Sequence, residues 1–204
     1  MGQGTAAPAG GLRERARRAI RAEIARVGME LFLRKGFEPT TVEEIAAAAG
    51  ISRRSFFRYF GSKDEVVLAH LDELAATVTE ALAARPADED PWVSLRRAFD
   101  AIVAEAEADR AAGFGLARLL NETEALRGQY AERQKRAWVG AAAPVIAERL
   151  PPLAGPGPDI RAEALVAAAL GCVAIVADAC LAGGPEADFA DLLDQAMAAV
   201  RPLG

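Results

Sequence analysis

The residues with the most evident chemistry lie in one short stretch, ISRRSFFRYFGSKDE, which runs from Ile51 to Glu65. If this stretch is helical, one face carries three arginines around one aromatic ring, and the other face carries three further rings. The basic face comprises Arg53, Arg54, Phe57 and Arg58, and the aromatic face comprises Phe56, Tyr59 and Phe60. Guanidinium groups set around a flat ring suit a polyanion with a groove. The alternative is a solvated cationic face beside an ordinary aromatic core.

Groups that transfer protons, attack substrates or hold metals are scarce in the rest of the chain. His70 is the only histidine, and no second histidine or cysteine stands at metal-ligand spacing from it. Carboxylates are scattered over helical faces, and Glu122 and Glu124 form no recognisable acid–base pair. We therefore predict no catalytic residue, no metal site and no cofactor, and we expect a binding protein and not an enzyme.

The net charge of −5 hides an uneven distribution. Residues 1–63 contain 12 Lys and Arg against six Asp and Glu, a net +6, whereas residues 64–204 contain 12 against 23, a net −11. A basic segment suits nucleic acid, and an acidic body would not itself approach a phosphate backbone. The charge pattern therefore predicts a nucleic-acid-binding unit in the N-terminal part.

Composition favours an all-α fold, because the chain has many alanines and only 6% aromatic residues, and no run alternates cleanly between apolar and polar residues.

Cys172 and Cys180 lie eight residues apart in one helical run. They would stand about 12 Å apart along the axis, so they cannot bridge each other. We expect two small buried side chains and a reducing cytoplasm. The fourteen apolar residues 164–177 predict a buried helix and no membrane span. Residues 1–12 predict a disordered tail.

Helical spacing and capping signals predict three helices between residues 13 and 63. The first carries an apolar stripe and ends at Gly36; the stripe is Ile20, Ile24, Val27, Leu31 and Phe32. Two overlapping capping boxes, Thr40 to Glu43 and Thr41 to Glu44, precede the second helix. Either threonine could therefore cap it.

The connection between the second and third helices has the spacing of a helix-turn-helix. Ala46 is small where the helices would cross, and Gly50 can adopt the positive φ that the turn needs. Phe56 can fill the core behind the third helix, whose first turn Ser52 can cap.

The acidic body contains candidates for a ligand pocket. Four aromatic and two aliphatic residues could line an apolar cavity: Trp92, Phe99, Phe114, Trp138, Leu120 and Ile175. Arg118 or Arg127 could meet an anionic group of the ligand. The alternative for each ring is ordinary core packing.

The last two helical runs predict a dimer interface. Small residues would let another helix approach closely; they are Ala164, Ala168, Gly171 and Cys172. Paired with their copies in a second chain, these two helices would form a four-helix interface. The alternative is that both close the core of a single chain.

The stretch IARVGMELFLRKGFEPTTVEEIAAAAGISRRSFFRYFGSKDEVV resembles, in order, the N-terminal domain of the TetR family of bacterial transcriptional regulators. The resemblance rests on Gly36-Phe37, the paired threonines, Ala49-Gly50-Ile51-Ser52, Tyr59-Phe60 and Ser62-Lys63. It implies an all-helical homodimer of about nine helices. Residues 13–63 would form the three-helix DNA-binding domain, and residues 64–204 a helical domain for ligand binding and dimerisation.

The resemblance also implies individual roles in binding an operator in double-stranded DNA. The third helix would enter the major groove, where Arg53, Arg54 and Ser55 would face base edges. The remaining contacts would go mainly to the backbone: Thr40 or Thr41 at the start of the second helix, Lys63 at the start of the fourth, and Arg58 and Tyr59. Phe57 stands where the family usually has tyrosine, so a phosphate hydrogen bond is replaced by contact with a thymine methyl or a sugar.

In the acidic body, RLLNETEALRGQYAERQKRAW is similar to actinobacterial TetR-like proteins thought to bind acyl-CoA-like ligands. The expected function is a cytoplasmic DNA-binding repressor that a small apolar or amphipathic inducer releases from its operator. The alternative is an all-helical small-molecule carrier or enzyme with only generic affinity for DNA.

Overall fold

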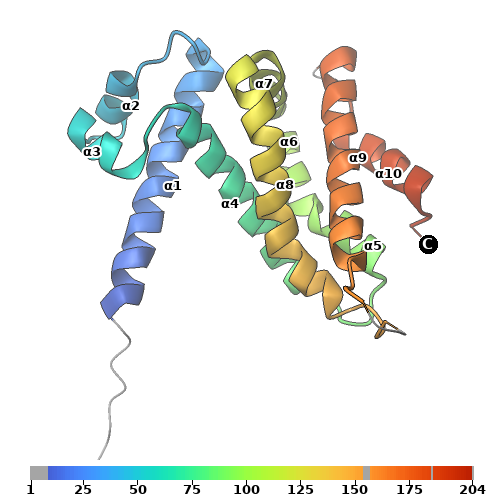
Figure 1. Ribbon diagram of the computed structural model, residues 1–204. Coiled ribbons are helices and arrows are strands. Elements are labelled where there is room, and N and C mark those ends of the chain that lie inside the picture. Colours follow the sequence, from blue (N-terminus) through green and yellow to red (C-terminus); the bar gives the residue numbers. More distant parts are fainter. Residues whose placement is uncertain (1–8, 154–156, 185, 204) are drawn as a thin grey trace, which may run out of the picture. The chain divides into compact units, whose positions relative to one another are not determined.

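The protein is all-helical in a computed structural model that describes residues 9–153, 157–184 and 186–203. Ten helices follow one another, and no strand occurs among these residues (Figure 1). They are α1 (Ala9–Lys35), α2 (Val42–Ala48), α3 (Arg53–Tyr59), α4 (Asp64–Ala83), α5 (Pro91–Ala98), α6 (Asp100–Ala108), α7 (Arg110–Glu122), α8 (Glu124–Ala147), α9 (Arg161–Gly183) and α10 (Phe189–Val200). The predicted all-α class is confirmed.

The chain divides into two compact units, Met1–His70 and Leu71–Gly204. The first contains α1, α2, α3 and the beginning of α4, and the second contains the rest of α4 and the helices that follow it.

The N-terminal unit is a helix-turn-helix with the predicted turn. Gly50 has φ +67°, a conformation that is easy only for glycine, and this turns the chain from α2 into α3. Ala46 and Phe56 are buried beneath the two helices. A further close approach was not predicted: a Cβ atom on Gly28 of α1 would lie 2.5 Å from Cγ1 of Val66. Glycine at this position therefore lets α1 pack tightly against α4.

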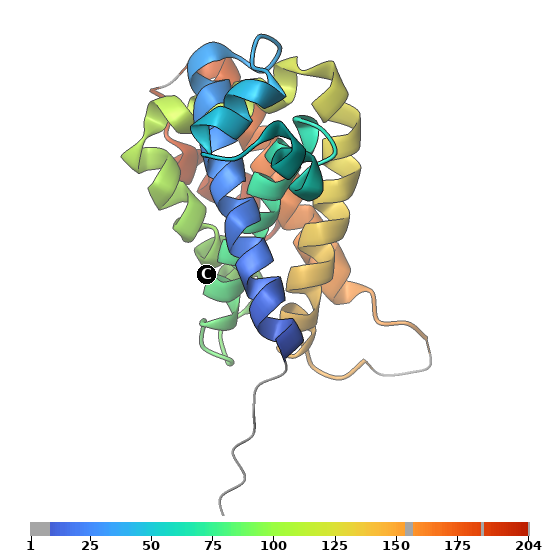
Figure 2. The same ribbon diagram turned by 90° about the vertical axis from the view of Figure 1, so that its left-hand side faces the viewer.

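The helix α1 begins earlier than predicted. Residues from Ala9 onward are helical, although residues 1–12 were expected to form a tail, while residues 1–8 lie outside the described part of the chain. The first turns of α1 project beyond α2 and α3 (Figure 2). They carry arginines and alanines, which favour helix even without packing.

The C-terminal unit packs its helices around one apolar core. Asp90 caps α5 by accepting hydrogen bonds from the backbone N–H groups of Trp92 and Val93, at 2.8 and 3.2 Å. The Trp92 indole N–H donates to the carbonyl oxygens of Met197 and Arg201, at 3.2 and 3.1 Å. This indole therefore fastens the start of α5 to the end of α10.

An arginine after α8 closes the end of α4. Arg149 Nη2 donates to the carbonyl oxygens of Leu82 and Arg85, at 2.8 and 3.0 Å. These carbonyls belong to the last turn of α4 and the residues after it, where a helix leaves acceptors unpaired and carries partial negative charge. The end of α4 and the end of α8 are thus held together.

The helix α9, predicted to be buried, is buried along one face only. Its inner face contributes Val166, Ala169, Cys172 and Val176 to the core. Its outer face leaves Gly171 and Ile175 exposed, the latter by 67%. Among the described helices α9 would pass as a membrane span by length and composition alone, a test that core helices of soluble proteins also meet.

The apolar stripe of α10 faces its own chain. Leu193 and Met197 are fully buried, and Phe189, Leu192 and Ala196 pack against the same core. The apolar stripe of α10 is therefore covered within its own chain, and the predicted pairing of the last two helices with a second chain stays a prediction. Of the two, only α9 keeps an open apolar face. The cysteines are free, as predicted, although only Cys172 is fully buried.

Candidate nucleic-acid interface

The start of α2 is fixed by one of the two candidate threonines. Thr41 is the N-cap: its hydroxyl accepts from the Glu44 backbone N–H at 3.2 Å, and the Glu44 carboxylate accepts from the Thr41 N–H at 2.8 Å. Thr40 is only 1% exposed, and its hydroxyl donates to the Gly36 carbonyl oxygen at 2.6 Å. The predicted phosphate contact therefore fits Thr41 and does not fit Thr40, whose hydroxyl is used inside the fold.

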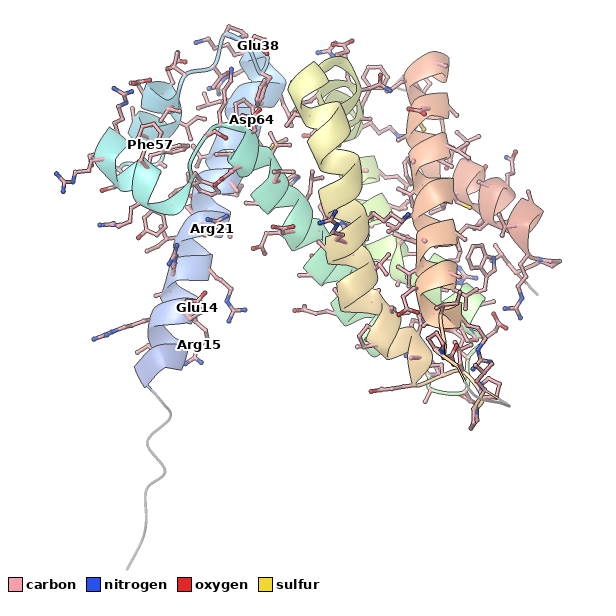
Figure 3. The ribbon with its side chains drawn as sticks, in the orientation of Figure 1. Glu14, Arg15, Arg21, Glu38, Phe57 and Asp64 are labelled. Carbon is pink, nitrogen blue, oxygen red and sulfur yellow. The ribbon has the colours of Figure 1, made fainter. Side chains whose placement is uncertain are left out.

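The recognition helix α3 is capped and anchored so that its basic face points to solvent. The Ser52 hydroxyl accepts from the Ser55 backbone N–H at 3.1 Å, which starts the helix. Phe56 has no exposed surface and its ring lies 5.6 Å from that of Phe60, so the aromatic face forms the core. Phe57 projects from the other side of α3 and is 47% exposed (Figure 3).

The arginines of α3 differ in what holds them. Arg53 Nε lies 2.9 Å from a carboxylate oxygen of Glu43, and its guanidinium stands 5.5 Å from the centre of the Phe57 ring. Arg54 is exposed, and no described residue pairs with it. Arg58 lies over the Tyr59 ring at 5.0 Å. Arg54 is therefore the α3 arginine that is most available to a ligand.

Lys63 is held by the loop between α1 and α2. Its ammonium donates to the carbonyl oxygens of Phe37 and Glu38, at 2.9 and 3.2 Å, and lies 4.3 Å from the centre of the Phe37 ring. The side chain is 23% exposed. Lys63 thus has a structural role that the sequence did not indicate, and its predicted phosphate contact stays a prediction.

Arg21 of α1 was missed by the sequence analysis. Its guanidinium donates to the carbonyl oxygen of Tyr59 and stands 4.4 Å from the centre of the Phe60 ring. It therefore caps the C-terminal end of α3 and joins that end to α1. No local signal marks this residue, because its partners lie almost forty positions further along the chain.

Two of the predicted ligand residues are misplaced for a pocket. Trp92 is fully buried and its N–H is occupied by backbone carbonyls, so it belongs to the core. Ile175 lies on the exposed face of α9. Phe114 and Leu120 are partly buried, and Arg118 is exposed near Glu122. The Arg127 side chain lies outside the described residues.

Phe99 and Trp138 come together, as a ligand site would require. Their rings stack with centres 6.0 Å apart, although 39 positions separate them in sequence. Trp138 is 4% exposed, and its buried Nε1–H has no hydrogen-bond partner among the residues that the structure describes. A buried donor without an acceptor costs about 1–3 kcal/mol. This indole is therefore ready to donate to an added acceptor.

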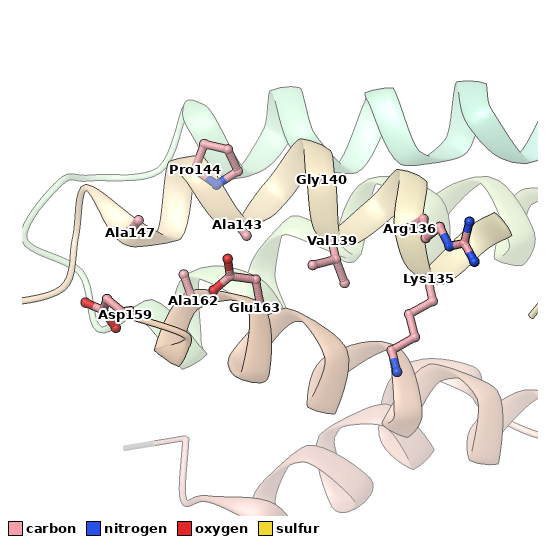
Figure 4. Close-up of a pocket in the computed structure, with 10 residues that line it drawn as sticks. All are labelled: Lys135, Arg136, Val139, Gly140, Ala143, Pro144, Ala147, Asp159, Ala162 and Glu163. Atoms are coloured by element: carbon pink, nitrogen blue, oxygen red, sulfur yellow. The ribbon is translucent and has the colours of Figure 1, made fainter. Parts of the chain in front are cut away.

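A hollow of about 570 Å³ lies between α8 and the start of α9 (Figure 4). None of the predicted ligand residues lines it. Its floor is made of small or apolar residues, with Lys135 towards one end and Glu163 towards the other; the floor residues are Val139, Gly140, Ala143, Pro144, Ala147 and Ala162. The hollow thus has a weakly apolar middle and ends of opposite charge.

Both halves of the chain match known protein families. Residues 24–70 match the bacterial regulatory proteins of the tetR family, and residues 89–203 match the MftR C-terminal domain. The chain belongs to the TetR family of bacterial transcriptional regulators. The first match includes α2 and α3, so the capped, basic helix α3 is the recognition helix of a TetR-family DNA-binding domain.

Individual relatives agree with this assignment. This TetR-family chain is 37% identical over 145 residues to the transcriptional regulator TcmR of Streptomyces glaucescens, covering 68% of this chain and 64% of TcmR. It is 34% identical over 84 residues to the transcriptional repressor Rv3405c of Mycobacterium tuberculosis, covering 41% and 43%. The crystal structure of the TetR-family repressor FadR of Thermus thermophilus, in complex with lauroyl-CoA, has a TM-score of 0.58 and 25% identity, covering 90% of this chain and 92% of FadR.

Proposed function

We propose that this TetR-family protein is a sequence-specific DNA-binding repressor that acts in the cytoplasm as a homodimer and leaves its operator when a small molecule binds. The observation that carries the proposal is the presentation of α3. The helix is capped by Ser52 and fixed from below by Phe56, while Arg54 on its outer face has no partner among the described residues.

Each predicted contact residue except Thr40 has a role in this proposal. Arg54 reads a guanine through O6 and N7, because an arginine can donate two hydrogen bonds to that edge. Arg53 and Ser55 face neighbouring bases, and the exposed ring of Phe57 contacts a thymine methyl or a sugar. Thr41, Arg58, Tyr59 and Lys63 contact the phosphate backbone, which fixes the register without reading sequence.

The dimer forms through α8 and α9. The outer face of α9 is rich in small residues and exposes Ile175, so a second chain can approach it closely. Two recognition helices then reach successive major grooves when they stand about 34 Å apart.

The ligand binds in the C-terminal unit, near the stacked rings of Phe99 and Trp138. The unpaired Trp138 N–H supports this position, because a ligand acceptor would satisfy it. Acyl-CoA-like molecules are the proposed class, since FadR, of similar fold, is a repressor found with lauroyl-CoA. Phe114, Leu120 and Arg118 are further candidates for this site.

Release follows if the ligand changes the separation of the two recognition helices. The ligand can do so only if it binds the released form more tightly than the DNA-bound form. By linkage, DNA must weaken ligand binding by the same factor. Scattering distances between the two DNA-binding units that stay equal with and without ligand would contradict this mechanism.

The test of DNA recognition compares wild type with Arg54→Ala on the DNA upstream of the protein's own gene, over a series of salt concentrations. We expect wild type to prefer that duplex over a random one by about 10³-fold or more. Arg54→Ala should lose about 1–3 kcal/mol of that discrimination. Arg34→Ala, an exposed arginine at the other end of the N-terminal unit's first helix, is the control.

The opposite result is equally clear. In that case, wild type binds duplexes from several candidate promoters with equal affinity, and salt weakens its binding to all of them equally. Such a protein has only generic affinity for DNA. The small-molecule carrier would then be the better interpretation.

A further inference from the structure

The first turns of α1 carry a group of exposed arginines that the recognition helix does not explain. Arg13, Arg15, Arg17 and Arg18 are all exposed, and this part of the chain precedes residues 24–70, which match the family's DNA-binding domain. Figure 3 shows Arg15 and Glu14 on the turns of α1 that come before Arg21. Glu14 is the only acidic residue in this segment of the helix.

Within the described part of the chain, no carboxylate is paired with Arg13, Arg17 or Arg18. Further along α1, Arg26 is paired with the carboxylates of Glu23 and Glu30. The projecting part of α1 is therefore a concentrated positive charge that stands free in water.

The position of Arg21 defines which arginines lie on the side of the recognition helix. Arg21 contacts Tyr59 and Phe60 at the end of α3. At 100° per residue, Arg17 lies about 40° and Arg18 about 60° from the Arg21 direction, and Arg13 lies about 80° from it. Arg13 and Arg17 lie to one side of the Arg21 direction and Arg18 lies to the other, so these three arginines flank that direction within about 80°. Arg15 lies about 120° away, beyond Arg18. From Arg21 to Arg13 the group extends about 12 Å along α1.

We propose that this row, Arg13, Arg17 and Arg18, is a second DNA-binding surface that holds phosphates flanking the half-site read by α3. The inference rests on the proposed operator binding. Since α1 and α3 belong to one compact unit and are joined through Arg21, DNA seated on α3 fixes where this row lies. The three arginines span about 7.5 Å along the helix axis. They can contact several phosphates, because duplex DNA carries a negative charge about every 1.7 Å of its axis.

The experiment measures binding of the full-length chain to a long operator duplex and to one trimmed to the recognised half-sites. The variant carries Arg13→Ala, Arg17→Ala and Arg18→Ala, since alanine keeps the helix, which circular dichroism can verify. On the long duplex we expect about 10- to 100-fold weaker binding and a salt slope reduced by up to about 5 for a dimer. The preference for operator over random DNA should remain.

The controls distinguish the effect of an arginine's position on α1 from the effect of the total charge. Arg15→Ala removes one charge from the other face and should change affinity on the long duplex by less than Arg17→Ala does. Glu14 lies about 20° from the Arg21 direction, so Glu14→Gln should tighten binding. On the trimmed duplex, wild type and the triple variant should bind alike.

Three results would overturn the inference. The first is a triple variant that binds the long duplex as tightly as wild type. The second is an equal loss for Arg15→Ala and Arg17→Ala, which would indicate a general charge effect. The third is tighter binding by the triple variant, which would show that the row occupies an acidic protein surface and competes with DNA. A failure of the proposed function differs, because wild type itself would then show no operator preference.

Discussion

At the residue scale, Thr40 and Thr41 have different roles, and the sequence did not indicate which of them caps α2. Each begins a Thr-x-x-Glu pattern, yet Thr41 caps α2 and Thr40 is buried with its hydroxyl on the Gly36 carbonyl. The capping signal was read correctly from the sequence. The choice between the two depended on how the chain leaves α1, which is a matter of tertiary packing.

The pairing of rings in the C-terminal unit could not be predicted in the same way. Phe99, Trp138 and Trp92 all follow helical spacing, which marks them as inward-facing without saying what they meet. The structure distinguishes the two tryptophans through their indole N–H groups. The N–H of Trp92 donates to two carbonyl oxygens, whereas that of Trp138 has no acceptor among the described residues. The sequence does not indicate which buried indole N–H lacks an acceptor.

The indole of Trp138 gives a residue-scale prediction. Trp138→Phe keeps an aromatic ring beside Phe99 but removes the unpaired donor. We expect DNA affinity without ligand to stay unchanged, while the lauroyl-CoA concentration that releases half of the DNA rises about 10-fold, the value of one hydrogen bond. Fluorescence anisotropy of labelled operator DNA measures both quantities.

Trp92→Phe is the matched control for this prediction. It removes an N–H that is already satisfied within the core, so it should lower the melting temperature without a comparable change in ligand response. An unchanged ligand response in Trp138→Phe would place the ligand elsewhere.

At the scale of elements, helix ends were predicted better than helix breaks. Gly50 and Ser52 act at the turn and the cap that their residue types indicated. No proline or glycine marks the break between α5 and α6. It falls at Phe99, the residue that stacks on Trp138, and so accompanies a contact between distant parts of the chain. Conversely, Pro144 lies inside α8 and does not split that helix.

The connection between α4 and α5 gives an element-scale prediction about pH. The Arg85 guanidinium chiefly, aided by the Ser94 hydroxyl, lowers the pKa of Glu89 to about 2. Because the folded pKa is below the unfolded one, Glu89 stabilises the fold above about pH 4.5, and this contribution is lost as the pH falls towards 2. We expect the loss to be about 1 kcal/mol after solvent screening, or a few degrees in melting temperature.

Melting curves at pH 5 and pH 3 test this expectation. Both tryptophans, Trp92 and Trp138, belong to the C-terminal unit, so their fluorescence follows its unfolding. The melting temperature of wild type should fall further between the two pH values than that of Glu89→Gln. Parallel falls would mean that the ion pair with Arg85 contributes nothing measurable.

At the scale of the whole molecule, the sequence could not tell which apolar stripes are covered within the chain. Both α9 and α10 carry apolar stripes, and periodicity does not say whether a stripe meets its own chain or another. The structure shows that the apolar stripe of α10 packs against the core of its own chain. It also shows that α9 has a second, solvent-exposed face. The TetR-family DNA-binding domain, by contrast, was predictable, because its caps, turn and core residues lie within a few helical turns of one another.

Gly171 provides the whole-molecule prediction. A Cβ added there meets no atom within 4 Å in the single chain, so Gly171→Leu should fold normally. In the proposed dimer the larger side chain would hold the two α9 helices apart. We expect a monomer by sedimentation velocity and a loss of operator binding, because a single recognition helix reads only half of the site.

Ala199→Leu enlarges an exposed residue of α10 in the same way and serves as the control. It should remain dimeric. If Ala199→Leu dissociated the dimer and Gly171→Leu did not, α10 would be the interface and the assignment to α8 and α9 would be wrong.

If the open face of α9 forms the proposed dimer, operator binding would depend on the abundance of the protein. By mass action, dilution would separate the chains, expose Ile175 and Gly171 to water and lower the apparent melting temperature. Below the dissociation constant, the number of paired recognition helices would fall with the square of the chain concentration. A modest change in copy number in the cell would then change operator occupancy more than proportionally, which turns a simple binding curve into a threshold.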